Sequence, residues 1–141
     1  MQRVLFDASI YVDSLRSQDQ ALIQKRTVVP GTVLWLSSVV LEELYAGSKR
    51  KPTRIVEKLE RDFKAVGRIL TPDLGDWVGA GRILAKIGAK HGFDHVGRSR
   101  LTNDTLIAVS AARFGIRVLT ANAKDYARIA EFRQFQWEIL R

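Results

Sequence analysis

The chain has 141 residues, of which 46% are hydrophobic and 27% are charged, and its formal net charge is +8. This length and balance predict one globular domain over 1–141, long enough to bury a hydrophobic core. The absence of cysteine excludes disulfides, thiolate zinc sites and cysteine nucleophiles. No apolar run reaches the roughly 18 residues that a membrane-spanning helix needs, so we expect no membrane partner.

The excess of positive charge is the most informative feature of the composition. Lysine and arginine number 23 against 15 acidic residues, and a basic surface attracts polyanions such as nucleic acids. A soluble protein with a solvated lysine-rich face has the same composition, so charge alone does not separate the two. The first residues enter a strand-like run without a signal-peptide pattern, and we therefore expect a cytoplasmic protein.

Strand-like apolar runs alternate with helical patterns, which predicts an α/β sandwich with a mostly parallel central sheet. The unbroken apolar run at 4–6 is typical of a central strand covered on both faces. In the first half of the chain, the sequence predicts a strand at 4–6, a helix at 9–15, a strand at 33–36, a helix from Ser37 or Ser38 to Gly47, and a helix opened by Pro52. A strand at 68–70, a helix capped by Thr71 and a loop at 92–100 follow. The last elements are a helix capped by Thr102 or Asn103 and ended by Gly115, a strand at 118–120, a short helix around Tyr126 and an edge strand at 135–139.

The first acidic residue of interest is Asp7, which directly follows the first predicted strand. Ligands of open α/β sheets gather at the carboxyl ends of strands, so this position suits a site. Taken alone, Asp7 also has the ordinary role of an N-cap for the next helix.

Glu43 lies on an apolar face of its predicted helix, flanked by Val39 and Val40 one turn earlier. A carboxylate buried there needs a cation or strong hydrogen-bond donors. Leu41 and Tyr45 make the other face apolar as well, so the helix has no clean polar side.

Asp104 begins a third acidic pattern, because Ile107, Ala108 and Ala111 continue its side of a helix. An acid in the first turn of a helix also suits the helix dipole, which is the common structural role. As a single residue, Asp104 fits either interpretation.

Taken together, these acids indicate a metal site. Three of them come from three segments, and Asn122 and Asp125 follow the predicted strand at 118–120. Clustered carboxylates repel one another unless a cation neutralises them, and hard oxygen ligands favour Mg²⁺ or Mn²⁺ over zinc. Metal-binding acids beside a basic surface suggest phosphodiester chemistry.

Four motifs, in this order, resemble those of the PIN-domain family, and in particular its VapC-like toxin ribonucleases. Together they cover nearly the whole chain. They are Leu5-Phe6-Asp7-Ala8-Ser9, Glu43-Leu44-Tyr45-Ala46-Gly47, Asn103-Asp104-Thr105-Leu106-Ile107-Ala108 ending at Phe114-Gly115, and Thr120-Ala121-Asn122-Ala123-Lys124-Asp125-Tyr126.

The resemblance implies a PIN-like three-layer α/β/α sandwich with the acids in one pocket. It implies a metal-dependent endoribonuclease, the toxin of a type II toxin–antitoxin pair, bound by a small antitoxin and commonly a homodimer. By analogy, Asp7 and Asp104 are the principal ligands of Mg²⁺ or Mn²⁺, and Glu43 helps to hold the metal or its water. Ser9 then orients Asp7 or a ligand.

The sequence departs from the family pattern at Asn122, where many relatives carry a fourth acid. Asparagine supplies a neutral carbonyl, and Asp125, one helical turn later, partly replaces the missing charge. One metal ion and two metal ions therefore both stay open, and so does a catalytically weak module that binds RNA or protein. A PIN nuclease of RNA processing without a toxin role is the other alternative.

Basic residues form two groups. Arg98 and Arg100, in the predicted loop before Asp104, are expected to contact RNA phosphates. Lys49, Arg50, Lys51 and Arg54 fit either a solvated turn or a second phosphate-binding patch.

The remaining candidates are given structural roles. His91 and His95 are expected in a loop without a metal role, and the three tryptophans Trp35, Trp77 and Trp137 in the core. Tyr11 and Leu15 fit either an interface or the core.

Overall fold

A computed structural model describes residues 1–17, 31–47 and 53–140 of the chain. Five strands form one sheet in the order β3-β2-β1-β4-β5, and every strand pair is parallel. The elements are β1 (Gln2–Phe6), α1 (Ala8–Ser17), β2 (Thr32–Ser37), α3 (Ser38–Ala46), α4 (Arg54–Ala65), β3 (Ile69–Leu70), α5 (Leu74–His91), α6 (Ser99–Phe114), β4 (Arg117–Thr120), α7 (Ala123–Ala130) and β5 (Trp137–Ile139).

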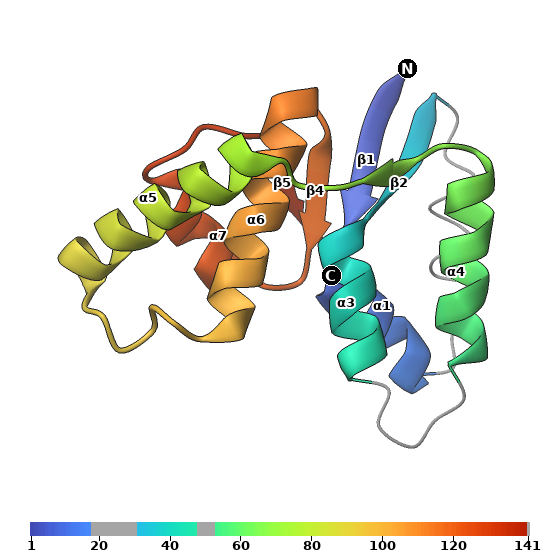
Figure 1. Cartoon of the computed structure of the whole chain (residues 1–141), viewed down its shortest axis with the longest axis horizontal. Helices are drawn as coiled ribbons and strands as arrows, with labels where there is room; N and C mark the ends of the chain where they lie inside the picture. The colour runs from blue at the N-terminus through green and yellow to red at the C-terminus, as the bar shows by residue number, and fades with distance from the viewer. Residues whose placement is uncertain (18–30, 48–52, 141) are drawn as a thin grey trace.

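Helices flank the sheet on both sides, which confirms the predicted α/β/α sandwich. In Figure 1, α5, α6 and α7 lie to the left of the strands, and α1, α3 and α4 lie below and to the right. The strand order reverses at β1, because β2 and β3 extend the sheet in one direction and β4 and β5 in the other. The carboxyl end of β1 is therefore the position at which this class of sheet binds its ligands.

The core explains why β1 is the central strand. Its last three residues, Val4, Leu5 and Phe6, are all buried, and Phe6 packs edge-on against the buried ring of Tyr11. Tyr11 thus belongs to the core. On the other side of the sheet, α6 is buried along most of its length.

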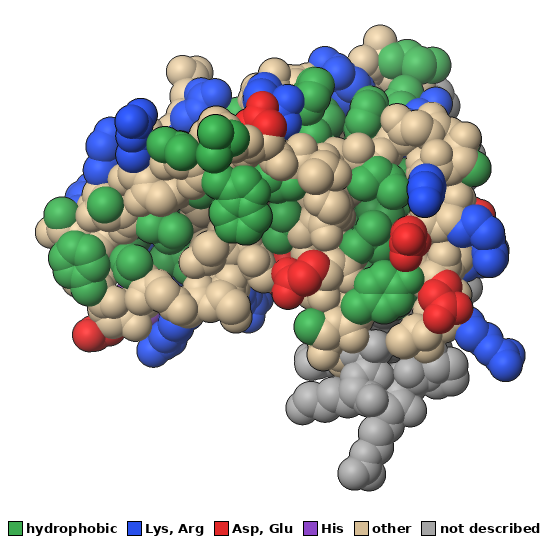
Figure 2. Space-filling view, in the orientation of Figure 1, with side chains coloured by type: hydrophobic (Ala, Val, Ile, Leu, Met, Phe, Trp, Pro, Cys, Tyr) green, Lys and Arg blue, Asp and Glu red, His purple; other side chains and the backbone are tan. Residues whose placement is uncertain are grey.

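The surface agrees with the composition of the chain. On the face in Figure 2, lysine and arginine lie mostly towards the margins, and hydrophobic and acidic side chains are spread over the middle and the edges. Within the described residues, no helix combines the length and the apolar character needed to cross a membrane. The side chain of Leu15 and the residues Lys49, Arg50, Lys51 and Pro52 lie outside the described part.

Two predicted helix starts are wrong. The N-cap of α5 is Asp73 rather than Thr71, because the carboxylate of Asp73 accepts the N–H of Asp76 and Asp76 accepts the N–H of Asp73 in return. Helix α6 starts at Ser99, earlier than the predicted caps at Thr102 or Asn103. Asp104 consequently lies in the second turn of α6.

Two further predictions need correction. The side chain of Trp77 is 55% exposed, because it lies in the first turn of α5 at the edge of a surface pocket. Trp35 and Trp137 are partly buried against the core, as predicted. His91 is the last residue of α5 and contacts a Glu131 oxygen at 3.0 Å, whereas His95 lies in the following loop.

Candidate functional site

Asp7 lies where β1 ends and is almost fully buried, with 2% of its surface exposed. Its Oδ1 accepts hydrogen bonds from the backbone N–H of Ser9 at 3.1 Å and from the Ser9 hydroxyl at 2.5 Å. Its Oδ2 accepts from the Thr120 hydroxyl at 2.5 Å. Burial raises the pKa of Asp7, although these hydrogen bonds favour the ionised form. Asp7 therefore caps α1 and also faces the end of β4.

The end of β4 holds Asp7 through a relay of polar groups. The backbone N–H of Asn122 donates to the Thr120 hydroxyl at 2.8 Å, and this hydroxyl donates to Asp7. The backbone N–H of Ala121 donates to the Ser9 hydroxyl at 3.1 Å. Each hydroxyl is both donor and acceptor, so the position of Asp7 is fixed from helix α1 and from the end of β4.

Asp104 faces the same place from α6 and is 4% exposed. Burial, together with the negative charges of Asp7, Asp125 and Glu43, raises its pKa to about 9. The Tyr126 hydroxyl lies 3.5 Å from Asp104 Oδ1. At neutral pH, Asp104 therefore keeps its proton unless positive charge is brought to the cluster.

Asn122 connects Asp104 to Asp125. Its side-chain amide donates to Asp104 Oδ2 at 3.0 Å and to Asp125 Oδ2 at 3.1 Å. Both N–H groups of this amide are thus used on acidic neighbours. Asn122, at which the sequence departs from the family pattern of a fourth acid, therefore lies between two acids.

Glu43 comes from α3 and completes the cluster. Burial and the negative charges of Asp7 and Glu42 raise its pKa to about 7, while Arg100 and Asn103 act in the opposite direction. Its Oε1 is buried and has no hydrogen-bond partner among the described residues. Such an atom is costly to bury, so this position favours a ligand that supplies positive charge or a donor.

These residues fit a divalent cation by their chemistry. Four carboxyl groups and an asparagine carbonyl are the oxygen donors that Mg²⁺ and Mn²⁺ prefer, and the unpartnered Glu43 oxygen lies among them. In the described part of the chain, however, no three acidic or histidine side chains converge on one point. The hydrogen bonds to Ser9, Thr120 and Asn122 account for this arrangement, because they direct the oxygens of Asp7, Asp104 and Asp125 at neighbouring donors.

The structure brings together most of the residues singled out from the sequence. Asp7, Ser9, Glu43, Asp104, Asn122 and Asp125 all belong to the cluster. Arg98 and Arg100 are exposed at the start of α6, and Arg100 is close enough to Glu43 to lower its pKa. Arg100 lies in the helix rather than in the predicted loop.

Two contributors had no predicted role. Thr120 belongs to the fourth sequence motif, but the sequence indicated no role for its side chain. In the structure, its hydroxyl donates to Asp7 and links β4 to the acid cluster. Tyr126 is fully buried, and burial and the neighbouring acids, Asp104 first, raise its pKa well above the ordinary value. Its position four residues after Asn122 was the available signal, since that spacing places it on the same side of α7.

The comparisons with known proteins agree with this arrangement. The family profile described as PIN domain matches residues 4–132. A comparison with curated protein sequences finds no significant match.

Several solved structures have the same fold over nearly the full length of both chains. The DNA-bound VapBC from Salmonella typhimurium is 22% identical with a TM-score of 0.69, and covers 99% of this chain and 98% of its own. VapBC2 from Rickettsia felis, bound to a DNA fragment from its promoter, is 20% identical with a TM-score of 0.71, and covers 99% and 100%. VapBC-1 from nontypeable Haemophilus influenzae is 20% identical with a TM-score of 0.63, and covers 98% of each chain.

At these identities the likeness to solved structures establishes the fold, and the family profile, which spans most of the chain, establishes the membership. The four acids at the reversal point of the sheet stand in the order of the four family motifs. The chain belongs to the PIN-domain family.

Proposed function

We propose that this chain is a VapC-like toxin, a metal-dependent endoribonuclease that hydrolyses RNA phosphodiester bonds. The observation that carries the proposal is the buried acid cluster, in which the pKa of Asp104 rises to about 9 and one Glu43 oxygen lacks a partner among the described residues. Although the net charge of the protein is +8, these acids are buried together, and their negative charges need a cation to compensate them. Family membership supports the same conclusion.

The residues that would hold Mg²⁺ or Mn²⁺ are Asp7, Glu43, Asp104 and Asp125. The chemistry that such an ion supplies when bound is neutralisation of charge on the phosphate and a lower pKa of water. The number of ions depends on Asn122, which contributes an amide where a further carboxylate would favour a second one.

The other residues position this machinery. Ser9 and Thr120 hold the Asp7 carboxylate in one orientation, and Asn122 does the same for Asp104 and Asp125. Arg98 and Arg100 lie exposed at the start of α6 and are suited to contact RNA phosphates.

The proposal includes the setting of the enzyme. A single domain over 1–141, located in the cytoplasm, would be bound by a small antitoxin and form a homodimer. The shared fold with VapBC proteins supports an antitoxin partner. A short neighbouring reading frame whose product binds and inhibits this chain would separate a toxin from a PIN nuclease of RNA processing.

The first test combines metal binding and cleavage in wild type and Asp7→Asn. Asparagine still accepts the N–H of Ser9 as a helix cap, so the variant should fold. We expect wild type to bind Mn²⁺ saturably in calorimetry and to cleave single-stranded RNA until EDTA is added. The variant should lose cleavage by at least about a hundredfold, since it removes a charged metal ligand.

Asp13→Asn is the matched control, because it removes an exposed acid from the neighbouring helix α1. It should cleave like wild type. Retained Mn²⁺-dependent cleavage by Asp7→Asn would contradict the assignment. Failure of wild type to bind metal even with RNA present would instead favour a module that binds RNA or protein.

A further inference from the structure

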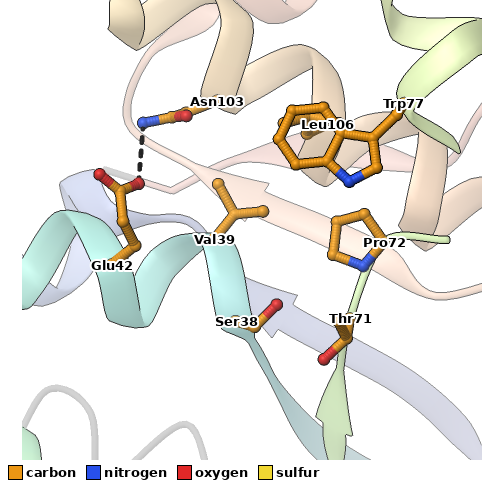
Figure 3. A pocket seen from close by; sticks show the side chains of 8 residues that line it. All are labelled: Ser38, Val39, Glu42, Thr71, Pro72, Trp77, Asn103 and Leu106. Atoms are coloured by element: carbon orange, nitrogen blue, oxygen red, sulfur yellow. Dashed lines mark hydrogen bonds between the residues drawn. The ribbon is translucent and has the colours of Figure 1, made fainter. Parts of the chain in front are cut away.

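A surface pocket of about 360 Å³ lies beside the acid cluster, between α3 and the start of α5 and α6. This volume falls within the range of small-ligand pockets, roughly 300–1,000 Å³. Figure 3 shows its two different ends, with Trp77 and Pro72 on one side and Glu42 and Asn103 on the other. No residue of the proposed catalytic set lines it.

The aromatic end is suited to a flat ring. Trp77 is 55% exposed, an unusual position for so large an apolar surface, and its indole faces the opening together with Pro72 and Leu106. An exposed tryptophan at a pocket is a stacking platform for nucleobases, because every base has a π-face.

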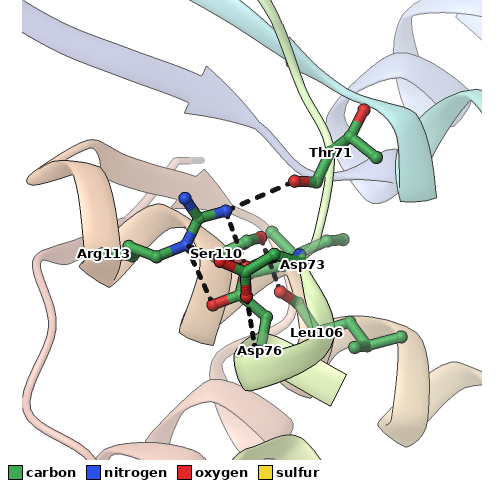
Figure 4. Close-up of polar contacts among 7 residues, drawn as sticks. Thr71, Asp73, Asp76, Leu106, Ser110 and Arg113 are labelled. Atoms are coloured by element: carbon green, nitrogen blue, oxygen red, sulfur yellow. Dashed lines mark hydrogen bonds and ion pairs between the residues drawn. The ribbon is translucent and has the colours of Figure 1, made fainter.

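The position of Trp77 is fixed by an ion-pair network at the start of α5, shown in Figure 4. Arg113 of α6 donates to Asp76 Oδ1 and Oδ2 at 2.8 to 3.1 Å, lies 3.4 Å from Asp73 Oδ2, and donates to the Thr71 carbonyl. Trp77 directly follows Asp76. The side chains of Asp76 and Arg113, which hold this platform, do not line the pocket.

The polar end carries hydrogen-bond groups in a defined pattern. The Asn103 amide donates to Glu42 Oε2 at 3.3 Å, so a carboxylate with two acceptor oxygens stands next to an amide donor. This bond is long, and the Asn103 amide also acts on Glu43, so a ligand that binds here would replace both contacts. Both residues are at least partly exposed to solvent.

The pocket and the acid cluster are one residue apart on two helices. Glu42 precedes Glu43 on α3, and Asn103 precedes Asp104 on α6. In a nucleotide, the base and the phosphate are separated by one sugar. A phosphate at the acid cluster would thus bring its own base, or the adjacent one, to this pocket.

We propose that this pocket binds a guanine base of a single-stranded RNA, next to the phosphate that is cleaved. Guanine presents two neighbouring donors, N1–H and N2–H, beside the acceptor O6. Once Asn103 turns away from Glu42, the Glu42 carboxylate can accept both donors and the Asn103 amide can donate to O6. Adenine, cytosine and uracil each lack this pair of donors beside an acceptor. This inference rests on the proposed ribonuclease function for its substrate class.

The test measures binding in EDTA, so that it does not depend on cleavage. Two single-stranded RNA hexamers that differ only by guanine or adenine at one position are titrated against wild type, Glu42→Gln and Trp77→Ala. We expect wild type to prefer the guanine hexamer and Glu42→Gln to lower this preference about tenfold, since a bidentate pair discriminates by roughly 1–3 kcal/mol. A hexamer with inosine, which keeps N1–H and O6 but lacks the N2 amine, should bind more weakly than the guanine hexamer and more tightly than the adenine hexamer.

Trp77→Ala should weaken the binding of all hexamers. In wild type, RNA should shift one indole N–H signal in the nuclear magnetic resonance spectrum, and Trp77→Ala should lack this shifting signal. Val78→Ala on α5 and Glu138→Gln on β5 are matched controls at exposed positions and should keep the wild-type preference. Equal binding of the three hexamers by wild type would overturn the proposal. Unchanged binding in both pocket variants would also overturn it.

The two proposals fail in different ways. Guanine preference in EDTA without metal-dependent cleavage would contradict the nuclease and leave the base site in place. Metal-dependent cleavage with no guanine preference, equal in wild type and Glu42→Gln, would contradict the base site and leave the nuclease in place.

Discussion

At Asp104, burial and charge repulsion act in the same direction. It is 4% exposed, and Asp7, Asp125 and Glu43 all disfavour its ionisation, so its pKa rises from 3.8 to about 9. The native protein without metal therefore holds a proton that the unfolded chain releases above about pH 4. The cluster reduces stability at neutral pH for the benefit of a ligand.

A pH dependence of stability follows from this proton. Because the native state binds the proton and the unfolded state does not, the free energy of unfolding should fall as pH rises from about 4 towards 9. The slope from one proton is about 1.4 kcal/mol per pH unit at most. Urea denaturation in EDTA at several pH values measures it, and Asp104→Asn, which stays neutral, should show a flatter profile.

Asp13→Asn serves as the control for this measurement, since Asp13 is exposed on α1 and should keep the wild-type slope. Parallel profiles for wild type and Asp104→Asn would show that Asp104 is ionised in the metal-free protein. Added Mn²⁺ should flatten the wild-type profile as well, because a bound cation favours the ionised acids.

Asn122 decides how the acids are neutralised without metal. Asn122→Asp replaces two hydrogen bonds, to Asp104 and Asp125, by a further negative charge. We expect the metal-free variant to lose roughly 2 kcal/mol of stability and to bind Mn²⁺ about tenfold more tightly in calorimetry. The double variant Asn122→Asp, Asp125→Asn has the wild-type charge and should lie between the two. Unchanged affinity in Asn122→Asp would mean that position 122 does not reach the ion.

At the scale of elements, the start of α5 depends on α6. Asp76 is 3% exposed, and its two carboxylate oxygens accept hydrogen bonds from Nε and Nη2 of the Arg113 guanidinium. Burial opposes the ionisation of Asp76, but Arg113 and the N–H of Asp73 outweigh it, so its pKa is lowered. This ion pair joins two helices that lie far apart in the sequence.

Arg113→Ala should therefore destabilise the protein by roughly 2–4 kcal/mol, because it leaves the buried Asp76 carboxylate without a positively charged partner. Urea denaturation at pH 7 measures the loss. Arg82→Ala, at an exposed position on α5, should cost far less. Equal losses in the two variants would show that the ion pair between Arg113 and Asp76 adds no measurable stability.

The sequence predicted the strands well because their patterns are local. The apolar run at 4–6 and the alternation at 135–139 became β1 and β5, and Ser37 caps α3 as expected. The acids could be predicted because each stands next to a strand end or on an apolar helix face. The expectation that these acids share one pocket came from the family resemblance. No spacing in the sequence shows how close they lie in space.

Helix starts were harder to predict because several residues compete as caps. Thr71 and Asp73 are both good caps, and only the reciprocal bonds with Asp76 select Asp73. No side chain caps α6, and its early start is stabilised by burial of Leu101. The exposure of Trp77 depends on which other helices cover it. The periodicity of apolar residues along α5 carries no information about these neighbours.

At the scale of the whole molecule, a net charge of +8 coexists with a buried cluster of acids. Arg98→Ala with Arg100→Ala removes two exposed charges at the start of α6, so the salt dependence of RNA binding should weaken. The slope of log affinity against log salt should fall by about 1.4, since each phosphate contact contributes roughly 0.7 for single strands. Arg61→Ala with Arg133→Ala, at other exposed positions, is the control and should leave the slope near the wild-type value. An unchanged slope in the first pair would place RNA elsewhere.

The hydrogen bond between Thr120 and Asp7 joins residues 113 positions apart in the chain. A ribosome adds Asp7 early, 113 residues before Thr120, and Asn122 and Asp125 follow later still. The acid cluster is incomplete until all of these residues have been made. For the proposed nuclease, activity would therefore begin only after Asp125 has been added, which leaves time for an inhibitor made beforehand to meet the folded protein.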